Sequence, residues 1–195
     1  MKHSIQEEIR GVLLFVASIW FVFLVDFLMP GKFVDWGLVP RTAWGLFGIP
    51  LAPFFHANLS HLVGNTLPLL VLLMLMAGSR TRTWQTVAQL VLFGGLLLWL
   101  FGRSASHVGA SMLVYSLITY LIVSGFQERR LVPLAIAILV GFLYGSALLS
   151  GVLPTAGSHV SWDGHLFGAI AGGLLGYFSV EAKRVDVKLT KPSAE

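Results

Sequence analysis

The chain has 195 residues, of which 56% are hydrophobic and 11% charged, and its mean hydropathy is +0.81. Soluble domains carry about 25% charged residues, so this composition excludes a water-soluble globule, a disordered chain and a nucleic-acid-binding domain. The net charge of +4 reflects scarce acidic residues rather than a basic patch. The chain has no cysteine, which excludes disulfides, thiolate metal sites and a cysteine nucleophile. The composition predicts an all-α, polytopic membrane protein.

Six stretches are long and apolar enough to cross a bilayer, which takes about 20 residues of helix. They are residues 11–29, 59–77, 84–101, 108–124, 131–150 and 162–180. We expect one membrane domain over residues 11–180, a six-helix bundle, between an N-terminal tail of residues 1–10 and a C-terminal tail of residues 181–195.

The distribution of positive charge orients this bundle. If the N-terminus is cytoplasmic, ten of the thirteen Lys and Arg residues lie inside, and the exceptions are Lys32, Arg41 and Arg103. This bias follows the positive-inside rule and places both termini in the cytoplasm. The outer connection over residues 30–58 is rich in Pro, Gly and aromatic residues, and we expect a compact hairpin lying in the membrane interface.

Polar residues occur inside three of the predicted spans, where they are costly and usually functional. The second span places His61 and Asn65 four residues apart on one helical face. The fourth span begins near Ser111, with Tyr115 four residues later, and the sixth begins near His165. All three spans run inward from the outer face, so these side chains should lie close together at the outer end of the bundle.

Glycines recur every fourth residue in the sixth span, at Gly164, Gly168, Gly172 and Gly176. Such a stripe of small residues lets a neighbouring helix approach closely. If that neighbour is the fourth span, His165 comes near Ser111.

A serine beside a neutral imidazole is typical of nucleophilic catalysis, because the imidazole accepts the hydroxyl proton and returns it to the leaving group. The backbone N–H groups of a helix's first turn, together with His61 and the Asn65 amide, would stabilise an oxyanion. Asp163 precedes His165 by two residues and should favour the helix dipole rather than reach the histidine ring. We therefore predict a Ser–His dyad without an acidic third member.

Other functions fit the sequence less well. A metalloprotease needs a motif such as H-E-x-x-H, which is absent, and Glu is missing from the span interiors, so we expect no metal and no cofactor. A proton-relaying transporter has six spans and membrane histidines in its favour, but no inverted repeat is visible. His107 and His159 fall in outer connections and are expected to have no special role.

With His61-x-x-x-Asn65, Gly109-Ala110-Ser111 and Gly164-His165-Leu166-Phe167-Gly168 in this order, the chain resembles the rhomboid family of intramembrane serine proteases over about residues 8–181. The resemblance implies a six-helix fold with a water-accessible cavity open to the outer face. It also implies that the protein cleaves transmembrane segments of membrane proteins in the lipid bilayer, in a bacterial plasma membrane, without a cofactor or nucleic acid.

By position, the resemblance makes Ser111 the nucleophile and His165 the general base. It assigns the oxyanion hole to His61, Asn65 and the Ser111 backbone N–H. The supporting positions are Gly109 before the serine, Tyr115 packed on the catalytic histidine, and His56 beside the outer connection.

The sequence departs from the family pattern at two places. Met112 follows the serine where the family usually has glycine, and Phe47-Gly48 replaces a Trp-Arg pair in the outer connection. The methionine keeps an alternative open: a rhomboid-like protein that binds transmembrane helices without cleaving them. The lost pair concerns the anchoring of the outer connection rather than the chemistry.

Overall fold

The computed structural model describes residues 5–29, 33–79, 82–154 and 161–190, with side chains up to residue 180. These residues form helices and no β-strand. In chain order the elements are α1 (Ile5–Leu28), η1 (Phe33–Trp36), α2 (Ala43–Leu51), η2 (Ala52–Phe54), α3 (Leu59–Ser79), α4 (Thr83–Phe101), α5 (Ser111–Glu128), α6 (Leu131–Gly151) and α7 (Trp162–Thr190).

Each predicted span corresponds to one of the six long helices, but two helices extend into the expected tails. α1 begins at Ile5 rather than at residue 11, because Glu7 and Glu8 in its first turn interact favourably with the helix dipole. α7 continues to Thr190 instead of ending at 180, since no glycine or proline interrupts the helical sequence there. Among the described residues, four helices are long and apolar enough to span a membrane, namely α1, α3, α4 and α6.

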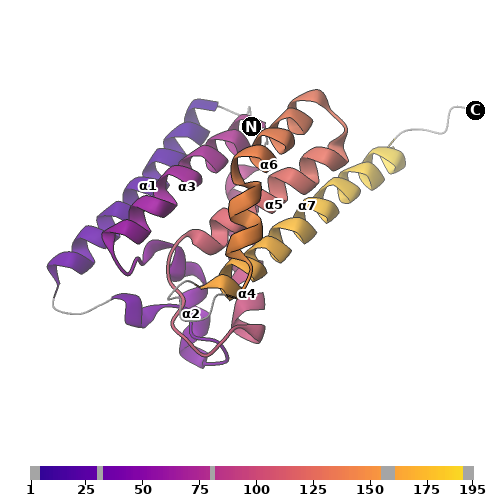
Figure 1. The fold of residues 1–195 in the computed structure, drawn as a ribbon. Helices are drawn as coiled ribbons and strands as arrows, with labels where there is room; N and C mark the ends of the chain where they lie inside the picture. The colour runs from indigo at the N-terminus through magenta and orange to yellow at the C-terminus, as the bar shows by residue number, and fades with distance from the viewer. Residues whose placement is uncertain (1–4, 30–32, 80–81, 155–160, 191–195) are drawn as a thin grey trace, which may run out of the picture.

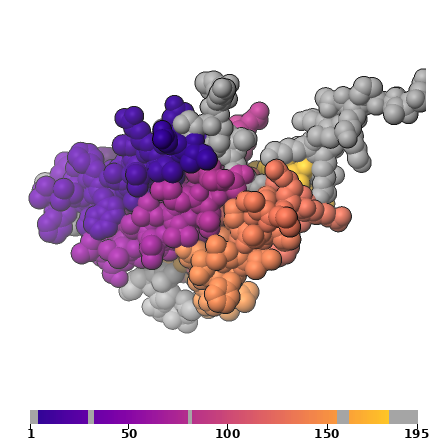
Figure 2. Space-filling view, turned by 90° about the horizontal axis from the view of Figure 1, so that it is seen from above, coloured from indigo at the N-terminus to yellow at the C-terminus, as the bar shows by residue number. Residues whose placement is uncertain are grey.

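The long helices run alternately up and down, so α1 begins and α7 ends on the same side of the bundle (Figure 1). At the opposite end, α3, α5 and α7 all begin, next to α2. Seen from above, α1, α3 and α6 follow one another across the molecule, which matches their order in Figure 1 (Figure 2). The polar residues that were predicted to converge therefore lie at one end of the bundle, near the first residues of these three helices.

α5 lies at the centre, in contact with α3, α4, α6 and α7. Leu113, Leu117 and Leu121 follow the four-residue spacing of one helical face and are fully buried. Its most extensive contact is with α7. The central position of α5 fixes where its first residue, Ser111, lies relative to the other helices.

Three of the four predicted stripe glycines form this contact between α5 and α7. A Cβ atom added at Gly168, Gly172 or Gly176 would meet the backbone carbonyl groups of α5, so only glycine allows the two backbones to come this close. Gly164 differs, because an added Cβ would instead meet Ser161 and Leu98. The sequence left open which helix the glycine stripe meets, and the structure shows that it is α5, the fourth span.

The outer connection contains a helix that its composition did not predict. α2 begins after Thr42, whose hydroxyl accepts a hydrogen bond from the Gly45 N–H at 3.0 Å, and it tolerates Pro50 in its last turn. Trp36, Trp44 and Phe47 are exposed. The ring centroid of Trp44 lies 6.4 Å from that of Trp36 and 5.7 Å from that of Phe47. Exposed, clustered aromatic rings fit the predicted place of this segment in the membrane interface.

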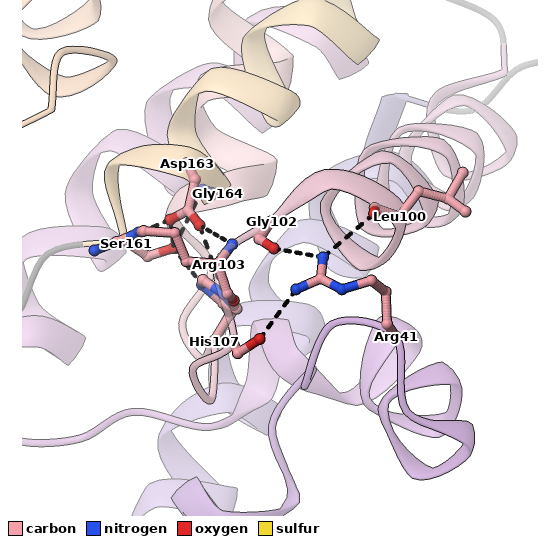
Figure 3. A network of polar contacts seen from close by, with 9 residues as sticks. Arg41, Leu100, Gly102, Arg103, His107, Ser161, Asp163 and Gly164 are labelled. Carbon is pink, nitrogen blue, oxygen red and sulfur yellow. Dashed lines mark hydrogen bonds and ion pairs between the residues drawn. The ribbon is translucent and has the colours of Figure 1, made fainter.

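Arg41 anchors the outer connection to the end of α4 in a chain that has Phe47-Gly48 in place of the expected Trp-Arg pair. Its guanidinium donates hydrogen bonds to the carbonyl oxygens of Leu100 and Gly102 at 3.3 and 2.7 Å and to the Ser104 hydroxyl at 3.0 Å (Figure 3). In return, the Trp99 indole N–H donates to the Thr42 carbonyl at 2.8 Å. A cation that satisfies the free carbonyls at a helix C-terminus is a favourable anchor.

Candidate active site

Ser111 is the first residue of α5, and the backbone before it is shaped by Gly109. Gly109 has a φ of 104°, which favours glycine, and a Cβ there would collide with the His61 ring. Its N–H donates to the Ala52 carbonyl at 2.9 Å, and the Ala110 N–H points to Nε2 of His56 at 3.5 Å. Ser111 is thus held at a helix N-terminus, where backbone N–H groups lack partners within the helix.

The start of α3 supplies three polar residues next to this turn. The Asn58 carboxamide oxygen caps the helix by accepting from the His61 N–H at 2.9 Å. The Asn65 amide donates to the His61 carbonyl at 3.0 Å, which uses one of its two hydrogens. The carboxamide nitrogen of Asn65 also lies close to Gly109. His61 and Asn65 therefore border the turn that leads into Ser111.

His56 lies in the connection before α3, with its ring 5.0 Å from that of His61. It is almost fully buried. Burial, and to a smaller extent the neighbouring His61, lowers the pKa of His56 from 6.5 to about 4. His56 is neutral at pH 7, and its Nε2 accepts from the backbone just before Ser111, which supports the turn.

His165 is held on two sides in the first turns of α7. Its Nδ1 lies 3.0 Å from the Gly151 carbonyl oxygen, at the last residue of α6. Its ring stacks on that of Tyr115 with centroids 4.1 Å apart and an interplanar angle of 3°. The Tyr115 hydroxyl in turn donates to the Ala147 carbonyl at 2.9 Å. The Nδ1 partner of His165 is a carbonyl, and Asp163 is engaged elsewhere.

A cavity of about 560 Å³ brings these residues together. Its walls include Ser111, His165, His61 and Asn65, with Tyr115 beside them. The remaining lining comes from α3, α5, α6 and the connections near them, namely Asn58, Ser60, Gly64, Pro68, Ser106, Val108, Val114, Ile118, Tyr144, Ala147 and Ser161. The cavity is polar near the helix starts and apolar deeper in the bundle, so it is suited to a peptide with apolar side chains.

Met112 points away from this cavity. It is buried in a cluster with Leu38, with Ile49 of α2 and with Leu98 of α4. Gly94 on α4 and Gly168 on α7 provide the space, since a Cβ at either position would contact the methionine side chain. The residue that departs from the family pattern therefore occupies a groove between helices rather than the cavity.

Sequence reasoning missed a polar network beside the site, in which His107 of the outer connection is buried and hydrogen-bonded. His107 Nδ1 lies 2.7 Å from the Ser161 hydroxyl, and its Nε2 lies 3.0 Å from the Arg103 carbonyl (Figure 3). The Asp163 carboxylate accepts from the Arg103 backbone N–H at 2.9 Å and its guanidinium at 3.1 Å. Ser161 before Asp163 is a helix-capping signal. The partners in the preceding connection lie beyond local sequence patterns, since His107 is 54 residues from Ser161 and Arg103 is 60 residues from Asp163. His159 lies outside the described residues.

Within the described part of the chain, no group of three or more His, Asp or Glu side chains is arranged to hold a metal ion. The cavity lining offers a hydroxyl at Ser111, an imidazole at His165 and hydrogen-bond donors at His61 and Asn65. These groups suit acyl transfer, in which a hydroxyl attacks a carbonyl carbon.

The comparisons agree with this architecture. The Rhomboid domain family matches residues 40–182. Two proteins named as uncharacterized, from Mycobacterium tuberculosis and Mycobacterium bovis, are each 40% identical over 193 residues, which covers 94% of this chain and 80% of the relative. Another from Mycobacterium leprae is 40% identical over 176 residues, or 85% of this chain and 69% of the relative. No solved structure matches the chain. Since the family match spans most of the chain, the protein is a multi-pass membrane protein of the rhomboid family.

Proposed function

We propose that the protein is an intramembrane serine endopeptidase that cleaves transmembrane segments of membrane proteins. The observation that carries the proposal is that Ser111, His165, His61 and Asn65 line the same cavity. Ser111 is the nucleophile and His165 the general base.

The Gly151 carbonyl supports the role of His165. A carbonyl oxygen only accepts, so Nδ1 must carry the proton, and Nε2 of the neutral ring is left as the basic nitrogen. In the first step the Ser111 oxygen bonds to the substrate carbonyl carbon and its proton moves to Nε2. The C–N bond then breaks, Nε2 protonates the leaving amine, and water hydrolyses the acyl-enzyme by the same route. The backbone carbonyl fixes the tautomer and the orientation of this histidine, which is one part of what an acidic residue does in a triad.

The oxyanion that forms when the serine attacks needs hydrogen-bond donors directed at its oxygen atom. We assign this role to the Ser111 backbone N–H at the start of α5, to the second hydrogen of the Asn65 amide and to His61. Gly109 lets the His61 ring approach the turn, and Tyr115 holds the His165 ring. The protein resides in a bacterial plasma membrane, with both termini in the cytoplasm and the cavity at the outer face.

The test is cleavage of a fluorescently tagged single-span protein by the purified protein in liposomes. We expect product with the parent and none with Ser111→Ala or His165→Ala. Ser116→Ala is the matched control, because the Ser116 hydroxyl lies on the same helix, is buried and donates to the Met112 carbonyl of its own helix. A fluorophosphonate probe should label the parent and Ser116→Ala but not Ser111→Ala.

A rhomboid-like protein that binds helices without cleaving them is the alternative outcome. Substrate retained by the parent without product, and without labelling of Ser111 by the probe, would establish that outcome and overturn the proposed protease.

A further inference from the structure

We propose that Asp163 is a positioning residue that sets the spacing between Ser111 and His165 by tying the start of α7 to the connection between α4 and α5. This inference rests on the proposed protease function. It concerns the network of Figure 3, in which Asp163, Arg103 and His107 are not among the residues that line the cavity.

Asp163 links the two segments through one carboxylate. The side chain is only 2% exposed, and one oxygen accepts the Arg103 backbone N–H at 2.9 Å while the other accepts the Arg103 guanidinium at 3.1 Å. The guanidinium also lies 5.2 Å above the Trp162 ring. A buried carboxylate is stable only when paired, so this charge holds residue 103 against the first turn of α7.

His107 adds a second link between the same two segments. It is 4% exposed, and it contacts the Ser161 hydroxyl through Nδ1 and the Arg103 carbonyl through Nε2. The Ser161 hydroxyl also accepts from the Gly164 N–H at 3.2 Å, which caps α7. Nε2 of His107 lies 3.7 Å from the Asp163 carboxylate, so both links meet at one point.

The two linked segments are close in sequence to the two proposed reacting residues. Asp163 is two residues before His165, and the His165 N–H donates to the Ser161 carbonyl at 3.1 Å. His107 is four residues before Ser111, and its backbone is fixed by two 2.9 Å hydrogen bonds with Leu38. The carboxylate therefore joins the chain segments that deliver the two proposed reacting groups, and a loosened link would misplace one relative to the other.

The experiment compares Asp163→Ala and Asp163→Asn with Asp26→Ala in liposomes. Asp26 is the matched control, because it is also a buried aspartate, it accepts the Phe33 N–H at 2.6 Å, and it lies outside the cavity lining. We expect Asp163→Ala to lower kcat per folded molecule about ten- to hundredfold, as misplacement by about 1 Å does, with KM within about twofold. Asp163→Asn, whose carboxamide oxygen still accepts from Arg103, should recover part of the loss. Asp26→Ala should keep the parent's kcat per folded molecule.

An unchanged kcat per folded molecule in Asp163→Ala, or an equal loss in Asp26→Ala, would overturn the proposal. A second readout does not need activity: the cysteine-free chain accepts spin labels at Ala105→Cys and Ile170→Cys, both exposed positions. We expect a broader distance distribution in Asp163→Ala than in the parent, and an unchanged distribution would contradict the positioning role. If the parent neither cleaves nor reacts with the fluorophosphonate probe, the proposed protease fails, and the spin-label distance still decides the role of Asp163.

Discussion

The ring of Tyr115 lies parallel to the ring of His165, with centroids 4.1 Å apart and planes inclined by 3°. The stack joins α5 to α7, and the Tyr115 hydroxyl extends the contact to the Ala147 carbonyl on α6. One side chain of α5 therefore contacts both α6 and α7 and orients the ring of the proposed general base.

Tyr115→Phe and Tyr115→Ala separate the two contacts of this side chain. Phe keeps the stack and loses one hydrogen bond, so we expect a stability loss of about 1 kcal/mol and a cleavage rate within a fewfold of the parent. Ala loses the stack as well and frees the His165 ring, so kcat should fall more than about tenfold. Thermal midpoints and cleavage rates of both variants are the measurements, and equal rates for the two would show that the stack is dispensable.

Asn65→Ala tests the proposed oxyanion donor. Loss of one such donor costs about 2.7–4 kcal/mol in the transition state, so kcat should fall by about 10² to 10³ while KM changes little. Thr66→Ala is the control, because the Thr66 hydroxyl in the next position donates to the Leu62 carbonyl of its own helix. Steady-state cleavage kinetics decide the matter, and a drop of less than about threefold in Asn65→Ala would remove Asn65 from the oxyanion hole.

The pKa of His56, lowered to about 4 by burial and by His61, predicts that stability depends on pH. Between pH 6.5 and 4 the unfolded chain binds a proton at His56 that the folded protein does not. The stabilisation is therefore complete above pH 6.5 and is lost as the pH falls toward 4, by up to about 3 kcal/mol. Thermal midpoints in detergent at pH 7 and pH 4.5 should differ less in His56→Gln than in the parent, and an identical pH dependence would contradict the assignment.

Met112→Gly restores the usual family residue but is expected to harm this protein. Met112 is buried in a groove formed at Gly94 and Gly168, so its removal leaves a void and adds a glycine to α5, at a combined cost of about 3 kcal/mol. The cleavage rate per folded molecule should not rise, because the side chain lies outside the cavity. A large gain in cleavage, measured beside the thermal midpoint, would instead show that the methionine obstructs the site.

Neighbouring glycines in α7 provide a matched pair for the contact with α5. A Cβ at Gly172 would meet the Ser116 carbonyl and the Thr119 hydroxyl, whereas a Cβ at Gly173 would meet nothing within 4 Å. Gly172→Ala should therefore destabilise the protein by about 1–3 kcal/mol, and Gly173→Ala should stabilise it by about 0.5–1 kcal/mol. Denaturation of both variants is the measurement, and the same sign for both would contradict the close backbone contact.

The sequence predicted the six long helices because hydropathy and a four-residue glycine spacing are local or periodic signals. The glycine spacing also predicted a close helix contact at Gly168, Gly172 and Gly176, and the structure shows that the neighbour is α5. The sequence did not predict α2, which is too short and too rich in glycine and proline for a periodic pattern.

In the candidate site, too, local sequence patterns predicted some features and not others. Ser111, His165, His61 and Asn65 were singled out as candidates because they interrupt apolar spans. The Gly151 carbonyl was not, because a backbone atom leaves no mark in the residue pattern. The link between Asp163 and Arg103 joins positions that are 60 residues apart, and only the folded chain shows which of several polar residues at one end are partners.

The last turn of α6 offers carbonyl oxygens to two groups in the cavity, at Ala147 for the Tyr115 hydroxyl and at Gly151 for Nδ1 of His165. Much of α6 is exposed along its length, and it encloses less of the core than α3 or α4. A displacement of α6 away from α5 breaks both hydrogen bonds together. Nδ1 of His165 then loses the acceptor that fixes its proton, so the ring can take either tautomer. If a substrate enters by such a displacement of α6, access to the cavity and the readiness of the proposed base would alternate, and the return of α6 would restore both hydrogen bonds.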